Sequence, residues 1–258
     1  MFMFSRKHLD RPSGPKGRRA YAVGDIHGRI DLLDALIEKI HGDMESRALA
    51  ETLLVFVGDL IDRGPSSAEV VERLRTYRHE GVRTVFLLGN HEEVLLRILD
   101  GDASLIASWL RFGGAQCLAS YGVDELQLTG LSDSQIIRKV RGAVPREHVE
   151  FLKGFVDTCR FGDYLFVHAG IRPGVELRDQ EQSDLRWIRE PFLLDDRAHG
   201  FVVVHGHTIS AEVEERPNRI GIDTGAFATG VLTALAIEGA DRWYLDTRVQ
   251  ADTAPLAD

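Results

Sequence analysis

Three short apolar runs in the first hundred residues each end in a glycine that is followed at once by aspartate or asparagine. The runs at 19–23, 53–57 and 84–88 lead into GDIHG, GDLIDRG and GNHE. An amphipathic stretch follows each run, at 30–40, 66–79 and 92–99, and this alternation is typical of a layered α/β fold. In open α/β sheets, ligand sites form where the chain leaves the carboxyl end of a strand. The pattern therefore predicts the fold class and the sheet edge at which a site forms.

The remaining chain divides into a helical stretch and a second β-rich half. Between 101 and about 155 the apolar spacing predicts helices at 105–112, 132–140 and 146–155, which we interpret as an inserted cap. We expect a single domain at 19–248, with a flexible basic leader at 1–18 and a flexible tail at 249–258. Strand-like runs follow the cap at 164–167, 201–204, 219–222, 231–237 and 243–245.

The composition limits the classes of partner. The chain has 40 acidic and 31 basic residues, a formal net charge of -9, so its overall field repels polyanions and we expect no nucleic-acid partner. Cys117 and Cys159 are too few for a disulfide framework. The apolar runs are strand-sized and the start lacks the apolar stretch of a signal peptide. We therefore expect a soluble, cytoplasmic protein with no membrane partner.

Six polar side chains beyond the predicted strands form a set suited to metal binding. Two later strands deliver HAG at 168–170 and HGHT at 205–208. Carboxylate, carboxamide and imidazole donors without a thiolate suit divalent ions such as manganese, iron or zinc. Six ligands exceed what one four-coordinate ion needs, and a carboxylate can bridge two ions, so a two-metal site is favoured. The candidate ligands are Asp25, His27, Asp59, Asn90, His168 and His207, with Asp59 as the bridge.

The motifs GDIHG, GDLIDRG, GNHE, HAG and GHT, in this order, resemble those of the calcineurin-like metallophosphoesterases. Within that family the chain is most similar to the PPP-type serine/threonine phosphatases of bacteria and phages, over about residues 20–240 with a divergent middle. The resemblance implies a four-layer α/β/β/α sandwich of two mixed sheets with a small helical insertion beside the cleft. It assigns the first ion to Asp25, His27 and Asp59, and the second to Asp59, Asn90, His168 and His207.

The resemblance also implies direct attack of metal-bound hydroxide on phosphorus, because two cations lower the pKa of the water that they share. Arg63 of the DRG motif is expected to bind the phosphate oxygens. Arg189, in a Trp-x-Arg-Glu segment, is the second candidate, and Arg186 is a competing assignment. His91 resembles the general acid of the family, and Asp62 would orient it.

These features predict a phosphomonoesterase that acts on phosphoserine, phosphothreonine or phosphotyrosine in proteins, or on a small phosphoester. We expect two divalent ions, manganese first, with iron or zinc as alternatives. The nearest rival is a diadenosine tetraphosphate hydrolase, whose relatives usually read GNHD and lack the first aspartate of DRG; Asp62 and Glu92 favour the phosphatase. A nuclease ranks third because the chain is acidic. A scaffold protein without activity ranks low, since every expected ligand is present.

Several of these residues also have ordinary structural interpretations. A single Gly-Asp pair fits a strand-to-turn joint, and His91 could simply begin a helix. His205 would face the same side of a strand as His207, but we assign it to the core or the surroundings of the site. Trp109 lies at helical spacing from neighbouring apolar residues, so we expect it in the core of the cap rather than lining a substrate groove.

Overall fold

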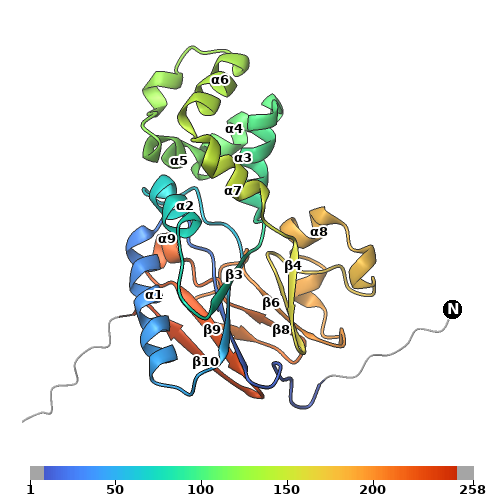
Figure 1. Cartoon of the computed structure of the whole chain (residues 1–258). Coiled ribbons are helices and arrows are strands. Elements are labelled where there is room, and N and C mark those ends of the chain that lie inside the picture. The colour runs from blue at the N-terminus through green and yellow to red at the C-terminus, as the bar shows by residue number, and fades with distance from the viewer. Residues whose placement is uncertain (1–8, 249–258) are drawn as a thin grey trace, which may run out of the picture.

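Two mixed five-stranded sheets form the centre of the computed structural model, which describes residues 9–248 (Figure 1). The first sheet has the order β10-β9-β1-β2-β3, in which β1, β2 and β3 are parallel. The second has the order β4-β5-β6-β8-β7, in which β5, β6 and β8 are parallel. The strands are β1 (Arg18–Val23), β2 (Glu51–Phe56), β3 (Val82–Phe86), β4 (Thr158–Phe161), β5 (Tyr164–Val167), β6 (Val202–His205), β7 (Glu214–Glu215), β8 (Arg219–Gly221), β9 (Thr233–Glu238) and β10 (Asp241–Asp246).

Three apolar clusters separate four layers, because alternate side chains of each strand face opposite sides. Tyr21 and Val23 of β1 face the helices that cover the first sheet, whereas Ala20 and Ala22 face the second sheet. A third cluster, which includes Val203, fills the space between the second sheet and α8. This arrangement confirms the expected α/β/β/α sandwich. The covering helices are α1 (Ile30–Glu45), α2 (Ser67–Arg75), α3 (Asn90–Asp100), α8 (Gln182–Trp187) and α9 (Ala226–Thr229).

The segment between α3 and β4 is helical, and it projects from the sheets at the top of Figure 1. The expected helix at 105–112 is confirmed except for its last residue, because the backbone is helical to Arg111 and leaves helical geometry at Phe112 and at Gly113, whose φ is 117°. Trp109 is buried as expected, but Phe112 is exposed. The helices of this insertion are α4 (Ile106–Trp109), α5 (Ala115–Ser120), α6 (Asp133–Ala143) and α7 (Arg146–Lys153), with short turns η1 (Ala103–Leu105), η2 (Leu110–Gly114) and η3 (Glu125–Leu128).

The start of the described chain lies against both sheets. The N–H of Gly14 donates to the carbonyl of Gly239 at 2.7 Å, and the N–H of Ser13 donates to Asp163 at 2.9 Å. The expected flexible leader at 1–18 therefore overlaps residues with defined contacts. Residues 1–8, like the expected flexible tail at 249–258, lie outside the described residues.

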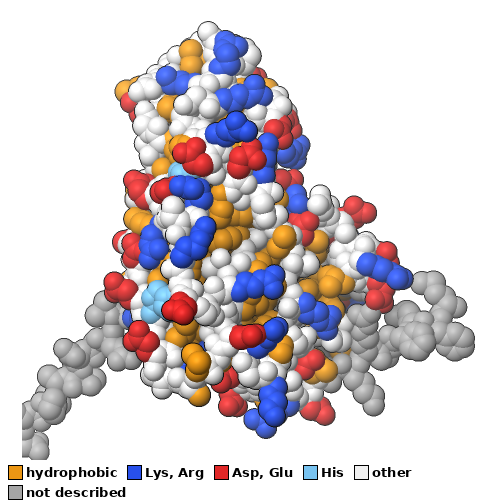
Figure 2. Space-filling model, in the orientation of Figure 1, with side chains coloured by type: hydrophobic (Ala, Val, Ile, Leu, Met, Phe, Trp, Pro, Cys, Tyr) orange, Lys and Arg blue, Asp and Glu red, His pale blue; other side chains and the backbone are white. Residues whose placement is uncertain are grey.

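Basic and acidic side chains are interspersed over the face that Figure 2 shows, with apolar side chains between them. Within residues 9–248, no helix combines the length and the apolar composition that crossing a membrane requires.

Candidate metal centre

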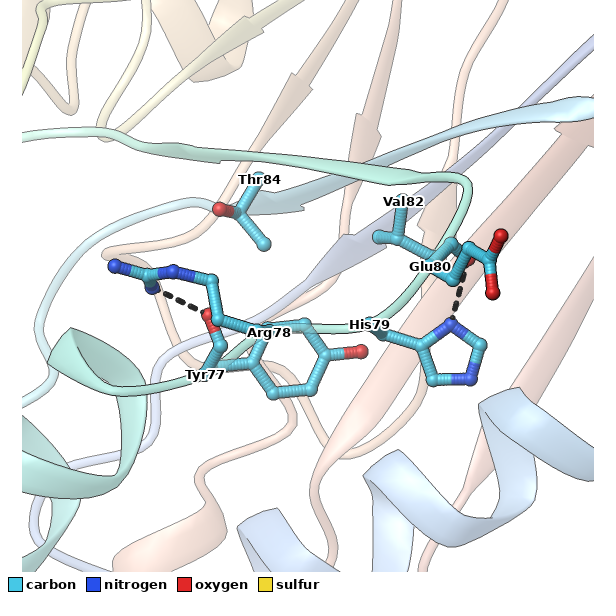
Figure 3. Close-up of a pocket in the computed structure, with 6 residues that line it drawn as sticks. All are labelled: Tyr77, Arg78, His79, Glu80, Val82 and Thr84. Atoms are coloured by element: carbon cyan, nitrogen blue, oxygen red, sulfur yellow. Dashed lines mark hydrogen bonds between the residues drawn. The ribbon is translucent and has the colours of Figure 1, made fainter.

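The structure has a hollow of about 330 Å³, which Figure 3 shows. The predicted site residues do not line it and lie at the opposite edge of the first sheet. That hollow is at the beginning of β3, whereas the motif residues follow the carboxyl ends of the strands. We therefore locate the candidate site by its chemistry and not by the size of a hollow. The hollow is lined by Tyr77, Arg78, His79, Glu80, Val82 and Thr84.

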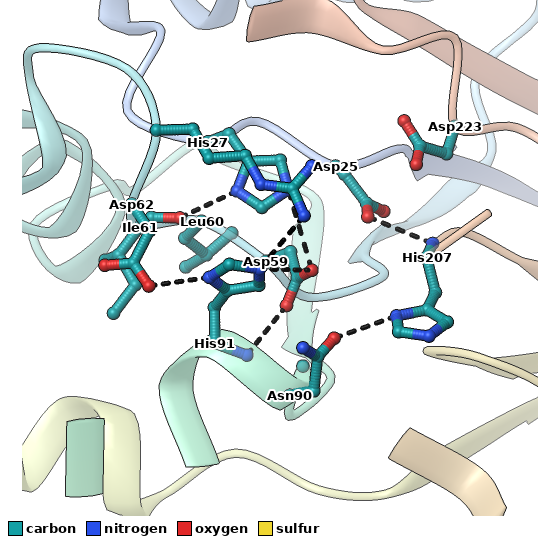
Figure 4. Close-up of polar contacts among 12 residues, drawn as sticks. Asp25, His27, Asp59, Leu60, Ile61, Asp62, Asn90, His91, His207 and Asp223 are labelled. Carbon is teal, nitrogen blue, oxygen red and sulfur yellow. Dashed lines mark hydrogen bonds and ion pairs between the residues drawn. The ribbon is translucent and has the colours of Figure 1, made fainter. Parts of the chain in front are cut away.

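The six candidate ligands follow the ends of five strands, β1, β2 and β3 of the first sheet and β5 and β6 of the second. Figure 4 shows five of them together, all except His168. Asp59 is central, because its carboxylate belongs to two groups of potential ligands whose donor atoms lie within 4.8 Å of one another. One group adds His27 and His91, and the other adds His168 and His207. All of these residues are buried. Asp59 thus belongs to both groups of potential ligands, and its role as a bridge between two ions stays a prediction.

Backbone carbonyls fix the orientation of two of the histidines. Nδ1 of His27 lies 2.8 Å from the carbonyl of Ile61, and Nδ1 of His168 lies 2.9 Å from the carbonyl of Val57. A carbonyl can only accept, so each Nδ1 must carry the proton and each Nε2 is left with a lone pair. Nε2 of His168 faces Oδ1 of Asn90 at 3.0 Å and Oδ1 of Asp59 at 3.4 Å. A lone pair that faces oxygen acceptors fits a cation between them.

Two further ligand atoms are buried without a hydrogen-bond partner among the described residues: Oδ1 of Asp25 and Nε2 of His207. The other carboxylate oxygen of Asp25 accepts the N–H of His207 at 3.0 Å, which joins the two sheets at the site. Gly206 makes this approach possible, since a Cβ at that position would lie 2.0 Å from Oδ1 of Asp25. Buried polar atoms normally have partners, so these two atoms fit a site that binds a cation.

The electrostatics of the cluster favour a cation. Burial, together with the carboxylates of Asp223 and Asp59, raises the pKa of Asp25 well above its usual value. Burial also raises the pKa of Asp223 to about 6, and lowers the pKa of His27 and of His207 to about 3 each. Neutral imidazoles have a free lone pair, and crowded buried carboxylates gain stability from a positive ion. The residues present therefore fit divalent metal ions.

His91 lies beside this cluster with one ring nitrogen already engaged. Its Nδ1 lies 2.6 Å from Oδ2 of Asp62, and its Nε2 lies 3.3 Å from Nη2 of Arg63 and 3.9 Å from Oδ2 of Asp59. Burial lowers the pKa of His91, but the carboxylates of Asp59 and Asp62 outweigh burial and raise it to about 9. The Asp62–His91 pair expected from the sequence is thus present. Arg63 also lies over the ring of Phe227, with its guanidinium carbon 4.7 Å from the ring centroid.

The two candidate arginines of the α8 segment differ in their contacts. Arg186 is mostly buried and lies 2.7 Å from Asp157 and 3.5 Å from Glu93. Arg189 is exposed, and among residues 9–248 its guanidinium has no hydrogen-bond or ion-pair partner. Its charge still acts on His168 and His207, where it helps to lower the pKa of both imidazoles. Arg189 is therefore the arginine with a free guanidinium near the cluster.

The backbone is strained at this site. Among the described residues other than glycine, positive φ values occur at five positions, and all five were singled out from the sequence. Such conformations cost about 1–3 kcal/mol each and concentrate where function requires them. They are His27 (47°), Asp59 (51°), Asp62 (71°), Arg63 (65°) and His207 (64°).

Sequence reasoning missed Asp223 and misjudged Glu92. Asp223 is 2% exposed and lies just beyond the carboxyl end of β8, but Ile222 separates it from the preceding glycine. The glycine-aspartate pair that marked the other motifs is therefore absent, and only its place after a strand could have indicated it. Glu92 is fully buried, and its carboxylate accepts the N–H groups of Asp59, Leu60 and Gly89. It holds the loop that carries Asp59. His205 is buried on β6, with Nδ1 3.0 Å from the carbonyl of Gly206.

The chain is similar over most of its length to known proteins. Many curated proteins match, among them symmetrical and asymmetrical bis(5'-nucleosyl)-tetraphosphatases. The symmetrical enzyme of Dechloromonas aromatica is 25% identical, covering 88% of this chain and 95% of that protein. A solved structure provisionally assigned as a diadenosine tetraphosphatase has a TM-score of 0.64 at 20% identity, covering 92% of this chain and 97% of that one. A cold-active protein-tyrosine phosphatase of Shewanella has a TM-score of 0.52 at 17% identity, covering 90% and 83%.

The family model described as calcineurin-like phosphoesterase matches residues 18–227, which is most of the chain. The match contains every candidate ligand found above. The chain therefore belongs to the calcineurin-like phosphoesterases and is a metal-dependent phosphoester hydrolase.

Proposed function

We propose that this chain hydrolyses bis(5'-nucleosyl) tetraphosphates with the help of two divalent metal ions. The observation that carries the proposal is the match to symmetrical tetraphosphatases over 88% of this chain and 95% of the relative, combined with a complete set of buried ligands. The identity is only 25%, so the substrate is a proposal. It departs from the phosphoprotein substrate that the motifs alone favoured.

In the proposed site, three side chains that follow strands of the first sheet would hold one ion. Side chains that follow strands of both sheets would hold the other. Manganese is our first choice, with iron or zinc as alternatives, because oxygen and imidazole donors suit all three. When bound, two such ions act as Lewis acids on the phosphate and supply a water nucleophile at neutral pH. The first set is Asp25, His27 and Asp59, and the second is Asp59, Asn90, His168 and His207.

The remaining residues would bind the phosphate and supply a proton. Arg63 and Arg189 offer guanidinium groups that match the oxygens of a phosphate, and Arg189 has no competing partner among the described residues. His91 turns Nε2 toward the cluster while Asp62 holds Nδ1 at 2.6 Å. This arrangement lets His91 give the Nε2 proton to the leaving oxygen as its bond to phosphorus breaks.

A phosphomonoesterase acting on phosphoproteins is the second candidate, and the Asp62–His91 pair favours it. A nucleotide leaves through a phosphate oxygen, whose pKa near 6 makes protonation of little value. The alkoxide of serine or threonine is a far poorer leaving group and gains much more from an acid. Both partners of the pair are buried, at 0% and 6% exposure, so the pair is built to hold a proton donor in place.

The glutamate of GNHE does not separate the two candidates. Its carboxylate is used by backbone N–H groups of the loop at Asp59, at 2.8 and 2.9 Å. An aspartate in its place would be shorter by one methylene and would meet the same groups only if the loop moved. The preference for glutamate thus concerns loop geometry, and Glu92 does not argue against a dinucleotide substrate.

The test is a substrate panel measured with added manganese: diadenosine tetraphosphate, phosphoserine and phosphotyrosine peptides, p-nitrophenyl phosphate and its bis ester. Asp59→Asn serves as the inactive control, and His91→Asn tests the proton donor. Dominant turnover of the dinucleotide to two ADP molecules supports the first proposal, whereas release of AMP and ATP indicates asymmetrical cleavage. Dominant turnover of a phosphopeptide moves the second candidate to first place.

A further inference from the structure

Trp109 of the helical insertion contacts the aspartate that orients the candidate general acid. Its indole Nε1 donates to both carboxylate oxygens of Asp62, at 3.2 and 3.1 Å. Trp109 is 3% exposed and Asp62 is completely buried. The two residues are 47 positions apart, so this contact ties the insertion to the loop after β2.

The carboxylate of Asp62 is held between two donors on different elements. His91, at the start of α3, approaches Oδ2 through Nδ1, and Trp109 approaches from α4. A buried carboxylate with a single donor could rotate about its side-chain bonds, whereas two donors from two directions fix its plane. The position of the His91 ring therefore depends on Trp109 as well as on Asp62.

The indole itself is closely packed. Gly114 packs on its face so closely that a Cβ there would lie 2.3 Å from the ring. An indole N–H can only donate, so facing an acceptor is the only polar contact available to it. Apolar packing alone requires no indole, since a phenylalanine ring fits within the same volume and lacks the N–H.

We propose that Trp109 is a positioning residue for the proton transfer: it fixes Asp62, and through Asp62 it sets the orientation of His91. The helical insertion then contributes to catalysis as well as bordering the cleft. This inference rests on the proposed role of His91 as general acid. It does not depend on which phosphate ester is the physiological substrate.

The test compares Trp109→Phe with a matched control on two aryl phosphates. The control is Trp243→Phe. Trp243 lies on β10 and also donates its indole N–H to a carboxylate, that of Asp43, at 3.1 Å. Phenyl phosphate has a leaving group with a pKa near 10, like that of tyrosine, and needs a general acid, whereas p-nitrophenyl phosphate needs one much less. We expect Trp109→Phe to lower kcat about tenfold on phenyl phosphate and about twofold or less on p-nitrophenyl phosphate. Trp243→Phe should change both equally or not at all.

A second measurement needs no turnover. In NMR spectra of the nitrogen-labelled protein, Asp62→Ala should shift the indole N–H signal of Trp109 and speed its hydrogen exchange, leaving the Trp243 signal in place. Trp109→Phe should in turn shift the His91 ring N–H signal. The inference fails if the His91 signal does not move, or if Trp109→Phe slows both aryl phosphates by the same factor.

Failure of the proposed function gives a different result. If diadenosine tetraphosphate and the phosphopeptides are not hydrolysed, the substrate proposal fails, while the NMR shifts and the leaving-group ratio still decide the role of Trp109. If His91→Asn slows phenyl phosphate and p-nitrophenyl phosphate by the same factor, His91 is not the acid and the role of Trp109 fails, while the proposed substrate is unaffected.

Discussion

The carbonyl of Gly113 in the helical insertion accepts a hydrogen bond of 3.2 Å from the backbone N–H of Arg63. Both residues have positive φ values, 117° at Gly113 and 65° at Arg63. A Cβ on Gly113 would lie 2.4 Å from the nitrogen of Arg63. The insertion therefore sets the position of an arginine that we expect to bind phosphate, through direct backbone contact.

Replacing Gly113 with alanine should disturb this contact. The added methyl group clashes with the backbone of Arg63, so we expect kcat/KM for a phosphoester to fall about tenfold as the guanidinium is displaced. The positive φ should also lower the free energy of unfolding by about 2 kcal/mol. Gly122→Ala is the matched control, because its φ is 80° and a Cβ there meets nothing within 4 Å. Equal losses of activity in both variants would show that only stability had changed.

Arg189→Ala should impair catalysis without affecting stability. Its guanidinium is free of partners among residues 9–248, so its removal breaks no contact of the folded chain. We expect kcat/KM to fall by about two orders of magnitude, and inhibition by inorganic phosphate to weaken, because one fixed cation is lost from the phosphate site. Arg189→Lys should recover only part of the activity, since an ammonium cannot form two parallel hydrogen bonds.

Arg186→Ala should show the opposite pattern. Arg186 pairs with Asp157 at 2.7 Å and is mostly buried. Its loss should lower the free energy of unfolding by about 1–2 kcal/mol, less than a fully buried pair would because Asp157 is partly exposed. Urea unfolding and steady-state kinetics measured on both variants separate the two roles. If Arg186→Ala weakens phosphate inhibition while Arg189→Ala does not, our assignment is reversed.

Asp59 and His207 should differ in how many metal ions they support. Asp59 belongs to both groups of potential ligands, whereas His207 belongs to one. The purified wild-type protein, reconstituted with manganese, should retain about two ions per chain. His207→Ala should retain about one, and Asp59→Asn should lose most of both, as measured by elemental analysis after dialysis. Retention of two ions by Asp59→Asn would contradict the bridging role.

The sequence was sufficient for the fold and for most of the cluster, because strand ends that carry glycine and aspartate leave a clear pattern. The glycines permit close approaches such as that of Gly206 to Asp25, and these constraints are local. Asp223 also follows a strand, β8, but Ile222 separates it from Gly221. Without the adjacent glycine, the local pattern that marked the other residues is absent.

Other contacts leave no local signal. The hydrogen bond from Trp109 to Asp62 joins residues 47 positions apart, and helical spacing alone indicates only that the indole is buried. The expected helix at 105–112 ends one residue early, because the chain turns at Phe112 and Gly113, where the carbonyl of Gly113 accepts the N–H of Arg63. Nothing in the local sequence shows which of Arg186 and Arg189 has a free guanidinium. The difference arises because Asp157 and Glu93, which are distant in sequence, lie beside Arg186.

The pH dependence of stability should contain a contribution from His41, beside the hollow in Figure 3. Nε2 of His41 lies 2.8 Å from the hydroxyl of Tyr77, and its ring lies 4.2 Å from that of His79. Burial first, and then the positive charges of His79 and Arg73, lower the pKa of His41, while Glu45 opposes them. An unfolded histidine binds its proton near pH 6.5. As the pH falls below about 6.5, His41 therefore binds a proton in the unfolded chain before it does so in the folded chain, and the free energy of unfolding decreases.

His41→Gln should make urea unfolding less sensitive to pH between about 7.5 and 5.5, and His79→Gln should raise the pKa of His41 seen by NMR titration. An unchanged slope in His41→Gln would assign the pH dependence to other groups.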